Sequence, residues 1–258
     1  MDNNEKNDIL FQERNNLVVK SNTLIQKSRY KLSAQEQKLL LYIISKIKPS
    51  DKEFRTMVLS LKQVCKVCGI TYNSKNYINF RNSITSLSDK GFWISTGKKD
   101  IYCRWVHPIC IDKEENTVEI RLDDNLLPYL IELRNNFTAY ELENILLFSS
   151  KYSIRLYEIL KSYSHIGRVS IDVDELKSLL GIPKEQYTEY KDFKKRVLNI
   201  ALKEIQEFSD LWIEIKPIRQ NKKIVAIEFD ISIKDIMLHT YAQEDRQKLL
   251  GGAEKYND

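Results

Sequence analysis

Glycine is scarce in this sequence, and several classes of function depend on it. The 258 residues include seven glycines, and neither G-x-G-x-x-G nor G-x-x-x-x-G-K-[ST] occurs. Glycine-rich loops that hold nucleotide phosphates are therefore absent. Histidine is rarer still, with three in the chain, and no arrangement of serine, histidine and acid has the spacing of a catalytic triad. We expect no cofactor and no enzymatic activity.

Long apolar runs are also missing. No run approaches the ~20 apolar residues that span a bilayer, and no apolar export segment lies near the N-terminus. We therefore expect a cytoplasmic protein with no membrane partner. Lysine and arginine number 41 against 36 acidic residues, which leaves a net charge of +5. This mild excess permits nucleic-acid binding without requiring it, so the positions of the charges must decide.

Metal sites have little support in the sequence. Four cysteines are present: Cys65, Cys68, Cys103 and Cys110. The C-x-x-C pair could begin a zinc or redox site, but with Leu61 and Val64 it has the i, i+3, i+4, i+7 spacing of one buried helical face. We favour core thiols in a reducing compartment and predict no metal. The acidic pairs at 123–124 and at 172 and 174 begin helices, where carboxylates cap free N–H groups.

The most informative single stretch is a helix predicted over residues 187–210. On a wheel of about 100° per residue, one arc is apolar: Phe193, Val197, Leu198, Ile200, Ala201, Leu202, Ile205 and Phe208. The opposite arc holds Lys195, Arg196, Asn199, Lys203 and Gln206. A helix lying in a DNA major groove requires such a face, although a solvated surface has the same pattern.

The rest of the chain divides around this helix. We predict a disordered arm over 1–16, a first domain over 17–136, a second over 137–240 and a polar tail over 241–258. Ser33 and Glu36 form a capping box that starts the first long helix. We also predict short helices over 123–133 and 139–148 and a longer one over 151–163.

An internal repeat indicates the fold. L-K-Q-V-C-K-V-C-G-I at 61–70 corresponds to D-V-D-E-L-K-S-L-L-G-I at 172–182, with Gly69 matching Gly181. Each copy continues with a helix and a hairpin, which is the order of a winged helix-turn-helix. We therefore predict an α+β, mostly helical protein of two tandem winged helix-turn-helix domains related by a pseudo-repeat.

The candidate DNA contacts follow from this fold, because helix and wing lie on one DNA-facing surface. In the second domain they are Lys191, Lys194, Lys195, Arg196, Asn199 and Lys203 on the helix and Arg219, Asn221, Lys222 and Lys223 at the hairpin tip. In the first domain they are Ser74, Lys75, Asn79, Asn82 and Ser83, with Lys98 and Lys99 at the tip. Either basic tip alone could serve solubility; their recurrence favours DNA binding.

Phosphate contacts are predicted at two helix starts. The segment that opens the helix at 151 supplies Ser150, Lys151, Ser153 and Arg155, and Arg29 is a weaker candidate. Free N–H groups at a helix N-terminus bind phosphate. An ordinary exposed helix start has the same sequence features, so both interpretations stay open.

Three blocks resemble a known family: S-N-T-L-I-Q-K-S-R-Y-K-L-S-A-Q-E-Q-K-L-L-L, Y-S-I-R-L-Y-E-I-L-K-S-Y and Y-K-D-F-K-K-R-V-L-N-I-A-L-K-E-I. They are similar to theta-type plasmid replication initiators of the Rep_3 class, over roughly 17–233. The resemblance implies monomers that bind direct repeats (iterons) of double-stranded DNA at a plasmid origin.

The same resemblance implies further partners and residue roles. The homodimer, in equilibrium with the monomer, would repress the protein's own promoter at an inverted-repeat operator, as part of copy-number control. Host replication initiator or helicase proteins would be recruited to the origin. Matched to the motif, Lys194, Lys195 and Arg196 become base or phosphate readers. Lys194 falls toward the apolar side of the wheel, so it serves only if the first turn protrudes from the core.

Alternatives from other classes remain. A rolling-circle nickase needs a His-apolar-His motif, which His107, His165 and His239 are too far apart to form. A dimeric winged-helix transcriptional regulator without a replication role would share every feature above. A protein-interaction module would show no salt-dependent binding to duplex DNA.

Overall fold

The first long helix begins where its capping box predicts. A computed structural model describes residues 3–70, 73–95, 97–107 and 110–234. In it, α3 (Ala34–Ile44) starts after Ser33, whose hydroxyl accepts from the Glu36 amide while the Glu36 carboxylate accepts from the Ser33 amide. The reciprocal bonds satisfy two N–H groups that a helix start leaves free. Most of α3 is buried, and it packs against α5 and α8.

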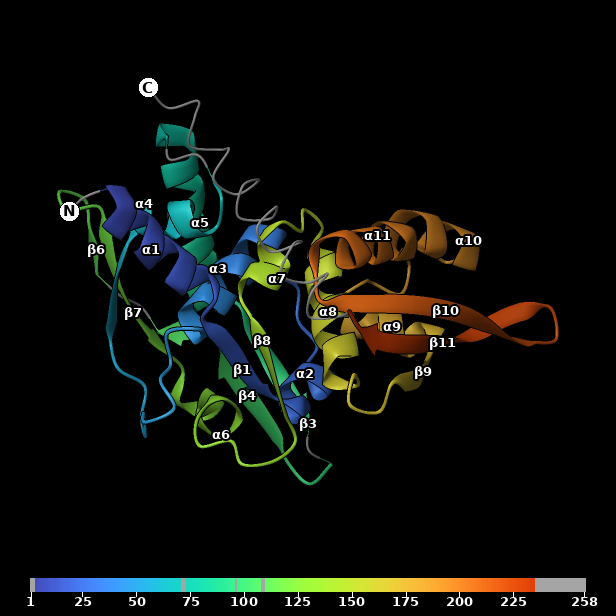
Figure 1. The fold of residues 1–258 in the computed structure, drawn as a ribbon. Helices are drawn as coiled ribbons and strands as arrows, with labels where there is room; N and C mark the ends of the chain where they lie inside the picture. Colours follow the sequence, from blue (N-terminus) through green and yellow to red (C-terminus); the bar gives the residue numbers. More distant parts are fainter. Residues whose placement is uncertain (1–2, 71–72, 96, 108–109, 235–258) are drawn as a thin grey trace.

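The repeated order is present in the fold. The first winged helix, which we define as 57–104, consists of β2 (Met57–Ser60), α4 (Leu61–Val67), α5 (Ser74–Asp89), β3 (Gly91–Ser95) and β4 (Asp100–Arg104). The second winged helix, 168–233, consists of β9 (Arg168–Asp172), α9 (Val173–Leu179), α10 (Tyr190–Phe193), a π-helical turn (Lys194–Leu198), α11 (Asn199–Phe208), β10 (Leu211–Gln220) and β11 (Lys223–Ile233). The predicted tandem winged-helix fold is confirmed (Figure 1).

Both copies make the same turn between their helices. Gly69 has φ 64° and Gly181 has φ 68°, a left-handed conformation that glycine adopts without steric strain. At Gly181 a Cβ atom would also lie 2.5 Å from the Tyr30 carbonyl oxygen, so space as well as conformation requires glycine there. The glycine match found in the sequence therefore marks a real structural equivalence.

The sheets of the two copies differ. In the second winged helix the strands are antiparallel in the order β10-β11-β9, so the hairpin extends the sheet of its domain. In the first, β2 pairs with β7 (Thr117–Leu122), which also pairs with β5 (Val106–His107) and β6 (Ile111–Asp112). The β3–β4 hairpin is a separate two-stranded sheet, joined to Ser28 by one bridge at Ile94.

A strand pair crosses the predicted boundary between residues 136 and 137. β1 (Leu17–Ser21) pairs with β8 (Phe137–Glu141), and α2 (Asn22–Lys27) packs on α8 (Lys151–Ser162). The helix predicted over 139–148 is therefore wrong, because its first residues belong to β8, which pairs with β1, and only α7 (Glu143–Leu146) is helical. Likewise, 123–133 forms a 3₁₀ turn (Asp124–Leu126) and α6 (Leu127–Leu130).

Residues 3–14 are not the disordered arm that their polar composition suggested. They form α1 (Asn3–Arg14), whose end is held by Arg14; this buried guanidinium donates to the Val67 and Lys66 carbonyl oxygens at 3.1 and 2.8 Å. Glu13 accepts from Tyr42, Lys46 and Gln63. Tertiary contacts thus order a segment whose low hydrophobicity predicts disorder. The predicted tail over 241–258 lies outside the described residues.

Buried charges join the N-terminal segment to the second domain. Lys20 on β1 donates to Glu158 on α8 at 2.7 Å, and Tyr140 donates to the same carboxylate at 2.8 Å. Burial alone would raise the pKa of Glu158, but Lys20, Arg155 and these hydrogen bonds hold that pKa below its ordinary value. Burial lowers the pKa of Lys20 despite the attraction of Glu158. The pair is nearly inaccessible to solvent, so it belongs to the core of the junction.

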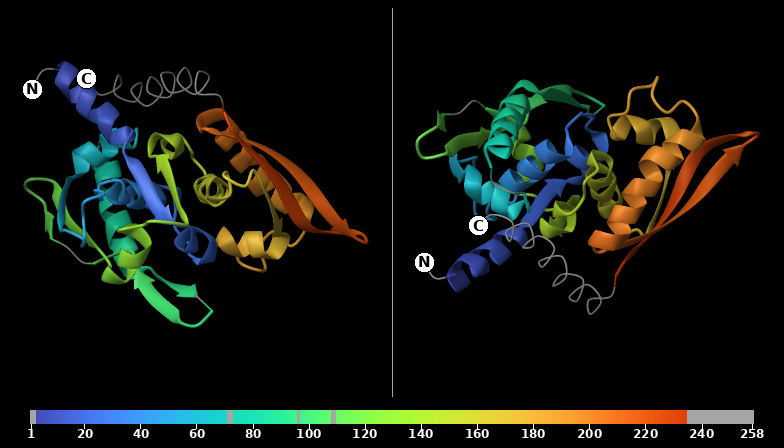
Figure 2. Two further views of the ribbon diagram at one scale, coloured as in Figure 1. Left: turned by 60° about the horizontal axis from the view of Figure 1, so that its bottom comes forward. Right: turned by 90° about the horizontal axis from the view of Figure 1, so that it is seen from above.

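Seen from two further directions, the tip of the second hairpin projects from the body of the molecule (Figure 2). β10 and β11 run alongside the α10–α11 helix, and their tip reaches beyond its α10 end (Figures 1 and 2). α5 and α11 are not parallel in Figure 1. Within the described ranges, every helix is too short or too polar to traverse a bilayer.

Candidate nucleic-acid interface

One turn of π-helix determines which side chains the second recognition helix exposes. The predicted helix runs from Tyr190 to Phe208 and is α-helical except at Lys194–Leu198. A π turn takes in one extra residue, so side chains before it are rotated by about 100° relative to an uninterrupted α-helix. Lys191 and Lys194, which a regular wheel places toward the core, are exposed in consequence.

All six predicted contacts on this helix lie at the surface. Lys191, Lys194, Lys195, Arg196, Asn199 and Lys203 are exposed, whereas Phe193, Val197, Ala201 and Ile205 are fully buried. Within the described part of the chain, none of the six side chains has an ion pair or hydrogen bond. We call this set the recognition face. An arrangement of unpaired cations around one amide is suited to bind phosphates and base edges.

The hairpin tip continues the same chemistry. Arg219, Asn221, Lys222 and Lys223 are all exposed, and none has a side-chain partner among the described residues. Asn221 has φ 57°, the left-handed conformation that asparagine tolerates in tight turns. The tip can therefore turn sharply and leave three cations in solvent.

Cations nearer the base of the same sheet are different, because they are paired. Lys216 donates to Asp230 at 2.7 Å, and Arg168 binds the other oxygen of that carboxylate. Their hydrogen bonds lower the pKa of Asp230, even though the group lies at the surface. The absence of partners on the recognition face and tip is thus a local property, since the base of the sheet neutralises its own charge.

The predicted phosphate site at the start of α8 is largely filled from within. Glu204 of α11 accepts from the Ser149 amide at 3.0 Å and the Ser150 amide at 3.2 Å. Ser150 caps the helix through the Tyr152 amide, and the Lys151 ammonium lies 5.0 Å from the Tyr152 ring centre. A carboxylate therefore occupies the N–H groups that a phosphate would need.

Two predicted phosphate contacts are wrong because their side chains are buried. Ser153 has no solvent exposure, and Arg155 has 3%. The Arg155 guanidinium donates to the carbonyl oxygens of Leu179, Ile25 and Ser28, and it lies 4.6 Å from the Tyr30 ring centre. It anchors the junction instead of the DNA. Sequence spacing alone could not show that residues 25–30 cover this side of α8.

Arg29 is also engaged within the protein. Its guanidinium forms an ion pair with Glu175 and donates to the Ser178 hydroxyl at 3.2 Å, both on α9. Burial lowers the pKa of Arg29. In this arrangement Arg29 links the two domains and is not free to bind a phosphate.

Fewer of the predicted contacts are exposed on the recognition helix of the first winged helix. On α5, Lys75 and Asn82 are exposed and Asn79 is half-buried. Ser83 is buried and donates to the Asn79 carbonyl oxygen at 2.9 Å, so its predicted DNA contact is wrong. The cap of α5 is Asn73, which accepts from the Asn76 amide, and Ser74 is the first helical residue.

The first wing is exposed at its tip and aromatic along its length. Lys98 and Lys99 are exposed beside Gly97, which has φ 79°. Trp93 on β3 and Tyr102 on β4 face each other across the hairpin with ring centres 5.1 Å apart. The tip is where the basic turn predicts it, but the strands belong to a separate sheet.

Other exposed side chains on the recognition helices lie outside the predicted contact sets. Arg81 and Ile78 on α5 are exposed, and so is Ile200 on α11. Ile200 was expected in the core, because it lies at the edge of the apolar arc on the wheel. Arg81 lies on the same exposed side of α5 as Lys75 and Asn82, so a wheel centred on that side would have found it.

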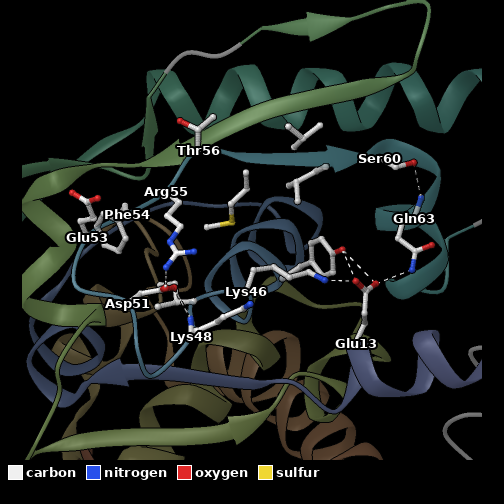
Figure 3. Close-up of a pocket in the computed structure, with 15 residues that line it drawn as sticks. Glu13, Lys46, Lys48, Asp51, Glu53, Phe54, Arg55, Thr56, Ser60 and Gln63 are labelled. Atoms are coloured by element: carbon white, nitrogen blue, oxygen red, sulfur yellow. Dashed lines mark hydrogen bonds and ion pairs between the residues drawn. The ribbon is translucent and has the colours of Figure 1, made fainter.

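A cavity of about 480 Å³ lies in the first domain, and none of its lining residues is a predicted DNA contact. It opens between β2 and the ends of α1 and α3, and Figure 3 shows Glu13, Lys46 and Gln63 meeting at one side of it. Those polar groups already bond to one another, so they hold α1 in place.

The cysteines and acidic pairs behave largely as structural groups. Cys65, Cys68 and Cys103 are buried, and burial raises the pKa of Cys65 to about 12 and of Cys68 to about 11. Cys110 is exposed, contrary to its predicted core position. Asp172 caps α9 and Asp123 caps the 3₁₀ turn, as predicted. No cluster of potential metal ligands occurs among the residues that the structure describes.

Comparison with known proteins finds two similar sequences and a similar solved structure. A replication initiation protein of Escherichia coli is 26% identical over 217 residues, covering 76% of this chain and 63% of that protein. The PI protein of Escherichia coli is 28% identical over 145 residues, covering 49% of this chain and 47% of that protein. The chain thus spans about half to two thirds of these relatives' lengths. Domains 2 and 3 of RctB give a TM-score of 0.42 at 13% identity, with 79% of this chain and 85% of that chain covered.

Family models match most of the chain. Residues 17–161 match the first winged-helix domain of initiator replication proteins, and residues 172–231 match the second. The first match contains the first copy of the repeat with its wing, and the second covers most of the second copy, including the recognition face and the β10–β11 tip. The chain therefore belongs to the Rep3 family of initiator replication proteins, which contain two winged-helix domains.

Proposed function

We propose that this protein is a non-enzymatic plasmid replication initiator that binds direct repeats of double-stranded DNA at an origin. The observation that carries the proposal is the recognition face, where five cations and Asn199 are exposed without side-chain partners among the residues that the structure describes. The basic tip of the neighbouring hairpin adds three more exposed cations without partners in the same described ranges. Membership of the initiator family supports a role in replication.

The mechanism follows from the chemistry of each element. The α10–α11 helix enters a major groove, where Arg196 and Asn199 reach base edges and the lysines bind phosphates. The β10–β11 tip follows the backbone beside that groove. α5 and the Lys98–Lys99 tip engage an adjacent part of the duplex with fewer charges. Bound copies strain the origin and recruit host replication proteins, and a dimer represses the protein's own promoter.

Binding and replication require separate tests. Affinity for a duplex carrying direct repeats, sought in the DNA beside the gene, is measured by fluorescence anisotropy against a scrambled duplex. We expect tight binding to the repeats that weakens steeply with salt. Arg168→Ala is the matched control, because Arg168 is an exposed arginine of the same domain already paired with Asp230. Equal binding to both duplexes would contradict sequence-specific recognition.

The role in replication is tested by maintenance of a minicircle that carries the same repeats. We expect the minicircle to persist only when the protein is supplied. Repeat binding without maintenance would instead support a dimeric winged-helix transcriptional regulator.

A further inference from the structure

Ile200 is an apolar side chain within a charged surface. It is 45% exposed, and it lies one helical turn from both Arg196 and Lys203, which are exposed as well. Residues spaced by three and four positions are neighbours on a helix surface. Ile200 therefore forms part of the recognition face, next to Asn199.

Packing of α11 against the core does not explain why an apolar side chain is exposed at Ile200. The core stripe of α11 consists of Ala201 and Ile205, and both are completely buried. A β-branched residue also brings no advantage in helix propensity at a surface position. Single exposed apolar residues are common in proteins, so the position of Ile200 carries more weight than its exposure.

That position has a specific chemical complement in DNA. The main apolar feature that base pairs display in the major groove is the C5-methyl group of thymine. We propose that Ile200 packs against one thymine methyl group in the bound repeat and so contributes to sequence specificity. The inference rests on the proposed placement of α10–α11 in a major groove, and it requires an A·T pair at one position of the bound repeat.

Two further observations support this assignment. Asn199 adjoins Ile200, and asparagine is the side chain that pairs with the N6 and N7 edge of adenine. The same arrangement recurs on α5, where Ile78 is 54% exposed and lies one turn from both Lys75 and Asn82. Both recognition helices thus present isoleucine together with an amide and a cation.

The test replaces single thymines by deoxyuridine, which removes only the methyl group. The probe is a duplex with the sequence that this protein enriches from a pool of random duplexes. For the unaltered protein we expect one thymine at which the replacement weakens binding about fourfold, the effect of one buried methyl group. Ile200→Ala should lose that response while responding normally at other thymines.

Two variants keep the test decisive. Ile200→Val retains a branched apolar side chain and should retain part of the response, while far-ultraviolet circular dichroism verifies folding. Ile166→Ala is the control, because Ile166 is 62% exposed outside the recognition helix and its loss should leave the response intact. An enriched sequence whose every thymine tolerates deoxyuridine, or an unchanged response in Ile200→Ala, would overturn the role of Ile200 alone. Failure to enrich any sequence would overturn the proposed function with it.

Discussion

The two winged helices differ in what lies beside their first strand. In the second, β9 pairs with β11, so one sheet connects the strand before the helices to the wing. In the first, β7 takes the place beside β2 and the wing is left as a hairpin of its own. The helices thus keep the same order in the two copies, although the hairpin after them joins the sheet of the first strand only in the second copy.

The two copies also differ in the number of cations that their recognition helices expose. The recognition face has five cations, whereas α5 exposes Lys75 and Arg81 among asparagine, threonine and isoleucine. The helix that precedes each copy in the chain, α3 or α8, is bonded to the end or the side of the following recognition helix through a glutamate, which belongs to α3 in the first case and to α11 in the second. Lys90 after α5 binds Glu36 of α3, while Glu204 of α11 accepts from amides that open α8. We expect the second domain to supply most of the affinity and the first to adjust register.

The largest expected effect concerns the junction that joins the N-terminal segment to the second domain. Arg155→Ala removes a buried guanidinium that three carbonyl oxygens and the Glu158 carboxylate depend on. We expect a loss of about 3–5 kcal/mol in the free energy of unfolding, as for a broken buried ion pair. Urea denaturation measures it, with the surface variant Arg168→Ala as control. A change below about 1 kcal/mol would mean that the protein is stable without this junction.

The next largest effect distinguishes the contributions of the two recognition helices to DNA affinity. Arg196→Ala and Asn199→Ala should each weaken binding to the cognate repeat by about 1–3 kcal/mol and relax its specificity. Lys75→Ala and Asn82→Ala, the corresponding changes on α5, should each have a smaller effect. Anisotropy titrations on one duplex compare all four variants. A greater loss from the α5 variants would reverse the ranking of the two domains.

A smaller effect tests whether the contacts made by Glu204 and Glu36 contribute equally to stability. Glu204→Ala leaves the Ser149 and Ser150 amides without their acceptor, and we expect a loss of about 1 kcal/mol in stability, similar to a lost helix cap. Glu36→Ala should have a comparable effect in the first copy, where it opens the capping box. Thermal unfolding follows both variants. If only one of them destabilises the protein, the two ties are not equivalent.

The smallest effect compares the two wings. Lys222→Ala should weaken binding to every sequence alike and reduce the slope of log K against log salt by about one, as for one lost phosphate contact. Lys98→Ala should reduce the slope less, because its hairpin is detached from the sheet of its domain. Lys113→Ala, at another exposed turn, should leave it unchanged. A loss confined to one sequence would show that Lys222 reads bases.

The sequence predicts local features well where a short-range signal defines them. The Ser33–Glu36 capping box, the Gly69 and Gly181 turns and both hairpin tips are confirmed. Features that depend on distant segments were missed. The β1–β8 pair, the burial of Arg155 by residues 25–30 and the docking of α1 through Arg14 all join residues more than 50 positions apart. Hydrophobic periodicity contains no information about such partners.

The π turn at Lys194–Leu198 has a consequence for how the chain can change over generations. An insertion or deletion of a single codon within a helix normally rotates one part of the helix by about 100° relative to the rest, which exposes core side chains. Here one residue is already in excess of a regular α-helix, so losing a codon within the turn would restore regular winding. The residues ahead of it, Lys191 among them, would rotate by about 100° while Asn199 and Lys203 stayed in place. One genetic event could thus reorient part of the recognition face and leave the buried Ala201 and Ile205 of α11 in place.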